Sequence, residues 1–115
     1  MNRKEMITKQ LEEEIEKSIL KLGGIPNYLI PKINISNDSA YPYLEIDNDG
    51  TIYIVIREKG IEYERDICVH IENTVFKLFE KITFELALNE EKSNENYSLE
   101  RVKNRQRELL KIAIS

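Results

Sequence analysis

The feature that most constrains the fold is an alternating stretch at residues 41–66, which reads YPYLEIDNDGTIYIVIREKGIEYERD. It contains three runs rich in β-branched and aromatic residues, at 41–47, 51–57 and 61–67, and short links separate them. Asp49-Gly50 closes the first link and Gly60 the second, and both glycines suit the positive φ of a tight turn. Links this short join antiparallel neighbours, because a parallel return needs about a dozen residues or more. The stretch therefore predicts a three-stranded meander.

The two faces of this meander are expected to differ, because side chains alternate between the faces of a strand. The face expected to pack against helices is apolar: Leu44, Ile46, Ile52, Ile54, Ile56, Ile61 and Tyr63. The other face mixes tyrosines with charged residues: Tyr41, Tyr43, Glu45, Asp47, Tyr53, Val55, Arg57, Glu62, Glu64 and Asp66. An antiparallel sheet commonly leaves one face in water, so this second face is either a solvated surface or a binding surface. Tyrosine offers rigid amphipathic contact area and the acids supply a negative field, which favours binding.

Helical patterns flank the meander on both sides. Asn2 and Glu5 form a capping-box pattern, and Gly23 and Gly24 end the first helix. Its apolar stripe is Ile7, Leu11, Ile15, Ile19 and Leu22. A second, more apolar helix begins after Val69, and its stripe is Ile71, Val75, Leu78, Phe79, Ile82 and Leu86. Ser98 is the expected cap of a third helix that is basic on its outer side.

Residues 25–40 are expected to tether the first helix to the sheet, and residues 32–35 are a candidate edge strand. The predicted fold is therefore a single α+β domain over residues 1–115. An N-terminal helix leads into an antiparallel meander of three strands, or four if the tether pairs with it. Two C-terminal helices then pack on one face of the sheet.

The composition limits the classes of partner and the location. The formal net charge is −4 over 115 residues, which disfavours a general affinity for nucleic acid or anionic lipid. Cys68 is the only cysteine, so no intrachain disulfide can form, and this fits a reducing compartment. The sequence has neither the apolar segment of a signal peptide nor the run of about 20 apolar residues that a membrane helix needs. The expected location is the cytoplasm.

Residue patterns for catalysis are weak in this sequence. Cys68 and His70 can in principle form a nucleophile–base pair or bind a metal, but a buried thiol and a structural histidine fit better. The segment from Asp47 to Gly50 contains alternating acids, yet it lacks the spacing of a calcium-binding loop and is better read as a turn. We therefore expect a protein that is not an enzyme and that uses no cofactor or metal.

Several short motifs resemble the Immunity protein 63 family, whose members protect bacteria from polymorphic toxins. Similar motifs run from about Gly24 to Leu110, so the resemblance covers most of the chain. The matching segments are Gly24-Ile25-Pro26 with Pro31, residues 53–60 (YIVIREKG), residues 82–87 (ITFELA), and Arg101 with Gln106, Leu109 and Leu110. Lys59 replaces the arginine of the family's Glu-Arg-Gly, only Arg101 remains of an Arg-Arg pair, and Lys103 replaces an aromatic residue. The resemblance implies inhibition of a toxin.

The leading hypothesis is an immunity protein that binds a cognate toxin domain and blocks its active site or its substrate surface. The partner is then the C-terminal domain of a toxin with a basic surface, such as a nuclease, and the immunity protein is a monomer or a weak homo-oligomer. The residues expected to contact it are Tyr43, Glu45, Asp47, Tyr53, Arg57, Glu58, Glu62 and Glu64. The alternative hypothesis is a non-enzymatic adaptor or oligomerisation module that uses the basic last helix or a free sheet edge.

Overall fold

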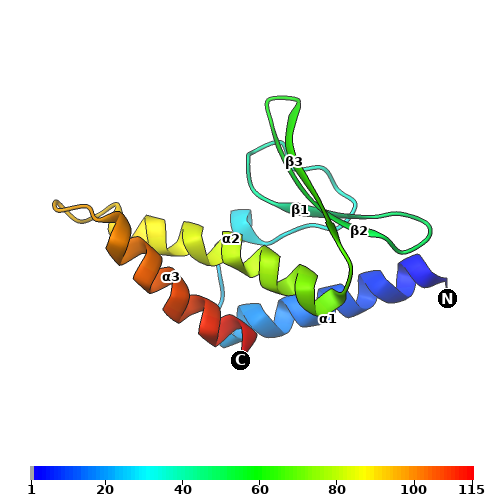
Figure 1. Cartoon of the computed structure of the whole chain (residues 1–115), viewed down its shortest axis with the longest axis horizontal. Coiled ribbons are helices and arrows are strands. Elements are labelled where there is room, and N and C mark those ends of the chain that lie inside the picture. Colours follow the sequence, from blue (N-terminus) through cyan, green and yellow to red (C-terminus); the bar gives the residue numbers. More distant parts are fainter. Residues whose placement is uncertain (1) are drawn as a thin grey trace.

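The computed structural model describes residues 2–115 and contains one sheet and three α-helices. The elements in chain order are α1 (Arg3–Lys21), the 3₁₀ helix η1 (Asn27–Leu29), β1 (Tyr43–Ile46), β2 (Ile52–Glu58), β3 (Ile61–Cys68), α2 (Ile71–Glu91) and α3 (Leu99–Ile114). The three strands form an antiparallel sheet in the order β1-β2-β3, and the helices lie together on one side of it (Figure 1). The predicted α+β fold and the placement of the C-terminal helices are confirmed.

Both hairpins use the glycines that the sequence analysis singled out. Gly50 has a φ of 89° in the β1–β2 turn, where the Asp47 side chain accepts hydrogen bonds from the backbone N–H groups of Asp49 and Thr51. In the β2–β3 turn, Lys59 has a φ of 52° and Gly60 a φ of 78°. Positive φ at both central residues is the geometry that matches the twist of the flanking strands. In the β1–β2 link, the Asp47 side-chain bonds and the pairing of Ile46 with Ile52 show that the segment from Asp47 to Gly50 is a hairpin turn, as predicted.

The predicted helix caps are also present. The side chain of Asn2 caps α1 by accepting a hydrogen bond from the Glu5 N–H at 2.8 Å, and its amide group donates to the Glu5 carboxylate at 3.3 Å, a bond between the two side chains of the predicted capping-box pair. Ser98 caps α3 by accepting from the Arg101 N–H at 3.3 Å. These bonds fix where α1 and α3 begin, because they satisfy backbone donors that have no partner within the helix.

The main core lies between the sheet and the helices. Its fully buried members include Leu11 of α1, Leu44 and Ile54 of the sheet, and Leu78 and Phe79 of α2. A second, smaller core consists of the buried residues Ala87, Val102 and Leu109. It joins α2 to α3 where this helical hairpin projects beyond the sheet (Figure 1).

The two edges of the sheet differ in how far other segments of the chain cover them. Along β1, the tether contributes a single parallel bridge between Ile33 and Leu44, with Asn34 N–H donating to the Leu44 carbonyl at 2.7 Å. The candidate fourth strand at residues 32–35 is thus reduced to one bridge. Within residues 2–115, β3 pairs only with β2, so its outer edge is open. No helix in the same range has the length and apolar character to cross a membrane.

Candidate functional site

A β-bulge decides which residues of β3 share the candidate binding face. Ile56 pairs with Glu64 while the next residue of β2, Arg57, pairs with Glu62, so Tyr63 is an extra residue in β3. An extra residue reverses the alternation of all side chains beyond it. Glu62 therefore lies on the face away from the helices, as predicted. The predictions that Glu64 and Asp66 lie on that face are wrong, because both lie on the helix side.

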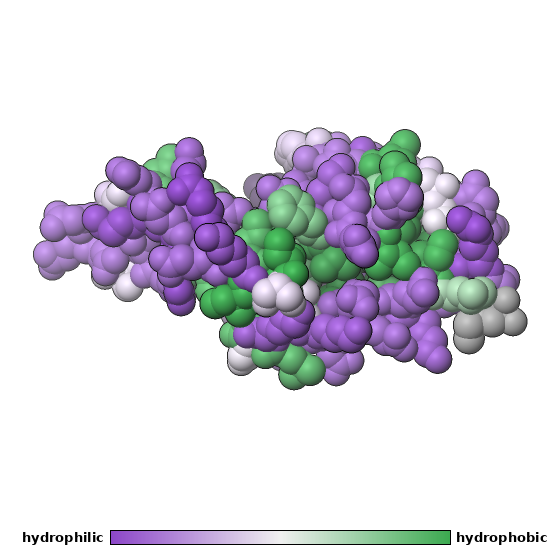
Figure 2. Space-filling model, turned by 60° about the horizontal axis from the view of Figure 1, so that its bottom comes forward, coloured by the Kyte–Doolittle hydropathy of each residue, from purple (hydrophilic) through white to green (hydrophobic). Residues whose placement is uncertain are grey.

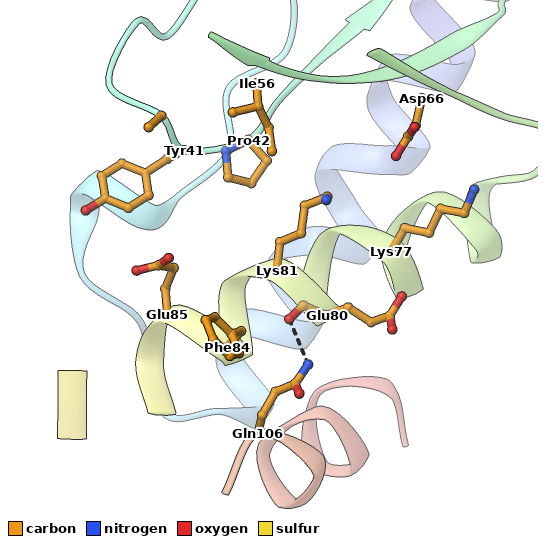
Figure 3. Close-up of a pocket in the computed structure, with 11 residues that line it drawn as sticks. Tyr41, Pro42, Ile56, Asp66, Lys77, Glu80, Lys81, Phe84, Glu85 and Gln106 are labelled. Atoms are coloured by element: carbon orange, nitrogen blue, oxygen red, sulfur yellow. Dashed lines mark hydrogen bonds between the residues drawn. The ribbon is translucent and has the colours of Figure 1, made fainter. Parts of the chain in front are cut away.

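The side of the sheet that faces the helices confirms this correction. Glu64 accepts a hydrogen bond from Lys81 Nζ of α2 at 3.0 Å. Asp66 points toward α2 and, with Lys77 and Lys81, lines a cleft of about 490 Å³ (Figure 3). The carboxylates are tolerated there because two lysines lie one helical turn apart on the opposite wall. Glu64 is therefore part of the contact between sheet and helix.

Arg65 organises the face of the sheet that points away from the helices, which we call the outer face. Its Nη2 atom lies 2.9 Å from Glu45 Oε2 and 2.7 Å from Glu62 Oε1. Its guanidinium carbon lies 5.3 Å from the centre of the Tyr53 ring. The hydrogen bonds from Arg65 hold the pKa of Glu62 below its usual value. Glu45, Tyr53 and Glu62, all predicted site residues, thus form one cluster around Arg65 that crosses the sheet from β1 to β3.

Tyr43 and Val55 lie on the same face but are inaccessible. Tyr43 is 3 % exposed and Val55 is 0 % exposed, and the two are paired across β1 and β2. Neither can contact a partner through its side chain in this structure. The prediction that Tyr43 is available for binding is therefore wrong, and its buried ring has a structural role.

β3 carries three exposed apolar side chains that were predicted to lie elsewhere or were left out of the prediction, and one of them, Ile67, lies on the outer face. Tyr63 was expected on the helix side but is 64 % exposed, because it is the bulged residue. Ile67 is 62 % exposed and pairs with Tyr53. Ile61 was expected in the core; it pairs with Glu58, on the helix side of the sheet, and is 55 % exposed at the hairpin end. Nothing in the residue types of β3 marks the position of the bulge, so the sequence pattern gives no indication of these exposed side chains.

The remaining predicted residues shape the two hairpin ends. Asp47 supports the β1–β2 turn and lies near Tyr53, whose pKa is raised by partial burial and by the Asp47 charge. Arg57 donates to the Gly60 carbonyl at 3.2 Å, and Asp38 of the tether accepts from the Gly60 N–H. Glu58 is exposed at the end of β2. These groups fix the hairpins, and of them only Glu58 projects freely.

The residues of the last helix that carry the family resemblance have structural contacts. Arg101 Nε donates to Glu91 at 2.9 Å, and Glu91 also accepts from the Ser98 N–H at 3.1 Å. Gln106 Nε2 donates to the Glu80 carbonyl at 3.0 Å (Figure 3). Both contacts tie α3 to α2. The position of Arg101 is thus explained by closure of the α2–α3 turn.

Replacing Glu91 with alanine is expected to destabilise the fold more than the same change at Glu90. Glu91 is 7 % exposed and supports the turn, whereas Glu90 only pairs with Arg105 at the surface. The Arg101 hydrogen bond holds the pKa of Glu91 below its ordinary value of 4.5. Its stabilising effect is therefore present above that value and is lost as the pH falls through the lowered pKa. Thermal unfolding of both variants at neutral and acidic pH checks this, and equal midpoints at neutral pH contradict it.

The cysteine–histidine pair does not form a site in this arrangement. Cys68 is 3 % exposed and belongs to the main core. His70 is exposed and precedes α2 without a side-chain capping bond. A buried thiol next to an exposed imidazole offers no accessible nucleophile.

Comparisons with known proteins add no relative. No family model matches the chain, and neither the curated proteins nor the solved structures contain a match.

Proposed function

We propose that this protein is an immunity protein that binds a bacterial toxin domain through the outer face of its sheet. The single observation that carries the proposal is an exposed apolar side chain beside an ordered charged cluster on the side of the sheet that points away from α1, α2 and α3 (Figure 1). Ile67 offers an apolar anchor, the exposed Tyr63 lies at the bulge next to Glu62, and the Arg65 cluster offers fixed hydrogen-bonding groups. Aromatic and apolar side chains that a partner can bury, surrounded by polar groups, are the usual composition of a binding hot spot.

The charge of this face fits a partner with a basic surface. Glu45, Asp47 and Glu62 bring carboxylates to it, while Arg65 neutralises part of that charge within the cluster. The remaining negative field steers a basic partner toward the sheet. Together with the motif resemblance, this supports a cytoplasmic inhibitor of a toxin such as a nuclease. The proposed mechanism is that this protein covers the active site or substrate surface of the toxin, which requires no catalytic group in the inhibitor.

Co-expression tests the functional class. The gene immediately upstream is expected to encode a large secreted protein with a C-terminal toxin domain. Expression of that toxin domain alone should stop growth, and expression together with this protein should restore it. A complex of the two should survive size-exclusion chromatography. Growth arrest that persists when this protein is present in excess contradicts the proposal.

Two charge reversals on β3 test the face. Glu62→Lys should slow association with the toxin domain by on the order of tenfold at low salt, because it removes negative charge from the outer face. Glu64→Lys is the matched control, since it also breaks one ion pair but on the helix side. Association rates from surface plasmon resonance distinguish the two. Equal rates for both variants assign the contact to another surface.

A further inference from the structure

The open edge of β3 carries backbone groups whose direction follows from the pairing across the sheet. The Leu44 N–H donates to the Lys32 carbonyl at 2.9 Å, and the Asn34 N–H donates to the Leu44 carbonyl at 2.7 Å. The backbone groups of Leu44 therefore point away from β2. Antiparallel partners alternate between pairs that exchange both hydrogen bonds and pairs that exchange none. Leu44 and Ile54 are a pair without hydrogen bonds, so the backbone groups of Ile54 point toward β3.

The same alternation identifies the residues of β3 that point outward. Ile54 pairs with Asp66, so these two residues exchange hydrogen bonds within the sheet. The neighbours of Asp66, which are Arg65 and Ile67, then direct their N–H and C=O groups to the open edge. No bridge or backbone hydrogen bond of Arg65 or Ile67 to a segment outside the sheet is found in residues 2–115. Each of the two residues thus offers one donor and one acceptor to a partner.

The bulge limits the part of this edge that another strand can use. Tyr63 is the extra residue, so the regular spacing of β3 extends over residues 64–68. This part is long enough to pair with a strand of about five residues, which is a common strand length. The Ile67 side chain beside it is 62 % exposed on the outer face. An apolar residue placed opposite Ile67 would form a favourable cross-strand pair with it.

The free backbone groups distinguish this edge from the apolar surface on the helix side. Figure 2 shows apolar side chains gathered in a hollow between hydrophilic ridges on that side. Helices satisfy their backbone groups internally except at their ends, so such a surface offers side chains without fixing the conformation of a partner. A row of free N–H and C=O groups is matched by the backbone of an extended chain. The edge of β3 therefore specifies an extended occupant.

We propose that an extended segment of the toxin domain pairs with residues 64–68 of β3 and adds a strand to the sheet. This inference rests on the proposed function and names how the partner engages the inhibitor. The assignment to the toxin domain follows from continuity, because an added strand lies directly beside the outer face. One partner can then contact Ile67 and the Arg65 cluster while its backbone pairs with the edge. In this mode the backbone hydrogen bonds supply affinity, and the side chain opposite Ile67 supplies specificity.

Amide hydrogen exchange followed by NMR tests the edge residue by residue. In the free protein, the amides of Arg65 and Ile67 should exchange faster than that of Asp66, because only Asp66 donates to β2. Addition of the toxin domain encoded by the upstream gene should slow exchange at Arg65 and Ile67 by on the order of tenfold or more. Slow exchange at these two amides in the free protein overturns the proposal, because the edge is then already occupied.

A pair of substitutions at Ile67 separates backbone pairing from side-chain contact. Ile67→Pro removes the outward N–H and leaves the ladder between β2 and β3 in place, because an edge strand tolerates proline where its nitrogen faces solvent. Ile67→Thr keeps the N–H and changes only the side chain. Surface plasmon resonance should show that Ile67→Pro weakens toxin binding about tenfold more than Ile67→Thr does. Circular dichroism verifies that both variants are folded, and equal affinities of the two folded variants overturn the proposal.

The outcomes distinguish this inference from the proposed function. A complex in which Arg65 and Ile67 exchange as fast as in the free protein overturns the edge pairing and leaves the immunity function in place. This measurement uses the wild-type chain, so it decides the question even if Ile67→Pro does not fold. Failure to form any complex overturns both proposals. Protection that rises with protein concentration in the absence of the toxin domain also overturns the edge pairing, because the occupant is then a second copy of this chain.

Discussion

Replacing Phe79 with alanine is expected to lower the free energy of unfolding by about 3–5 kcal/mol. Phe79 is 0 % exposed and belongs to the core cluster between α2 and the sheet. The loss combines the transfer free energy of the ring with the cavity that it leaves behind. Because a domain of this kind is stable by only about 5–15 kcal/mol, the variant is expected to be marginally folded at 37 °C. Urea unfolding followed by circular dichroism measures the change.

Phe76 provides the control for this prediction on the same helix. It is 40 % exposed and lines a surface cavity between α1 and α2. Phe76→Ala should therefore cost about 1 kcal/mol or less. Similar losses for the two phenylalanines would mean that α2 is rotated relative to its position in this structure.

Tyr43→Ala is expected to have the second large effect, a loss of about 3–5 kcal/mol in the free energy of unfolding. The residue is 3 % exposed although it lies on the outer face of the sheet. The physical reason is the same as for Phe79. The substitution removes a buried aromatic ring, and the surrounding side chains relax only partly into the cavity. Chemical denaturation measures the loss of stability. A toxin-binding assay at a temperature where the variant is folded then shows whether Tyr43 also contributes to binding.

Tyr63→Ala is the matched change on the exposed side of β3. Tyr63 is 64 % exposed, so its loss should alter stability by about 0.5 kcal/mol or less. Under the proposed function, the same change should weaken toxin binding. The opposite pattern, with Tyr63 important for stability and Tyr43 neutral, is incompatible with the positions of the two rings.

The fold was largely predictable from the sequence because several local patterns agree with one another. The turn residues at Gly50 and Gly60 define antiparallel hairpins, the cap at Asn2 begins α1, and the apolar spacing around Phe79 identifies the buried side of α2. Each of these depends on residues close together in the chain. A fold can be predicted from sequence patterns in this way when the local preferences agree with the global fold.

The candidate site was predicted less well because its composition depends on strand alternation over a longer distance. The assignment of faces holds as far as Glu62 and fails from Glu64 onward, because the bulge at Tyr63 adds one residue. Without the bulge, Arg65 belongs to the helix side, so its role as the centre of the outer face was missed. The burial of Tyr43 depends on tertiary packing, and the types of the residues beside it in the sequence do not indicate it.

The open edge of β3 has a consequence for self-association. Two copies that join through this strand about a twofold axis must place one residue opposite its own copy. At the middle of β3 that residue is Glu64, Arg65 or Asp66, and like charges directly opposite each other oppose pairing. Because the tether already covers the β1 edge, neither side of the sheet favours the stacking of identical molecules into fibrils.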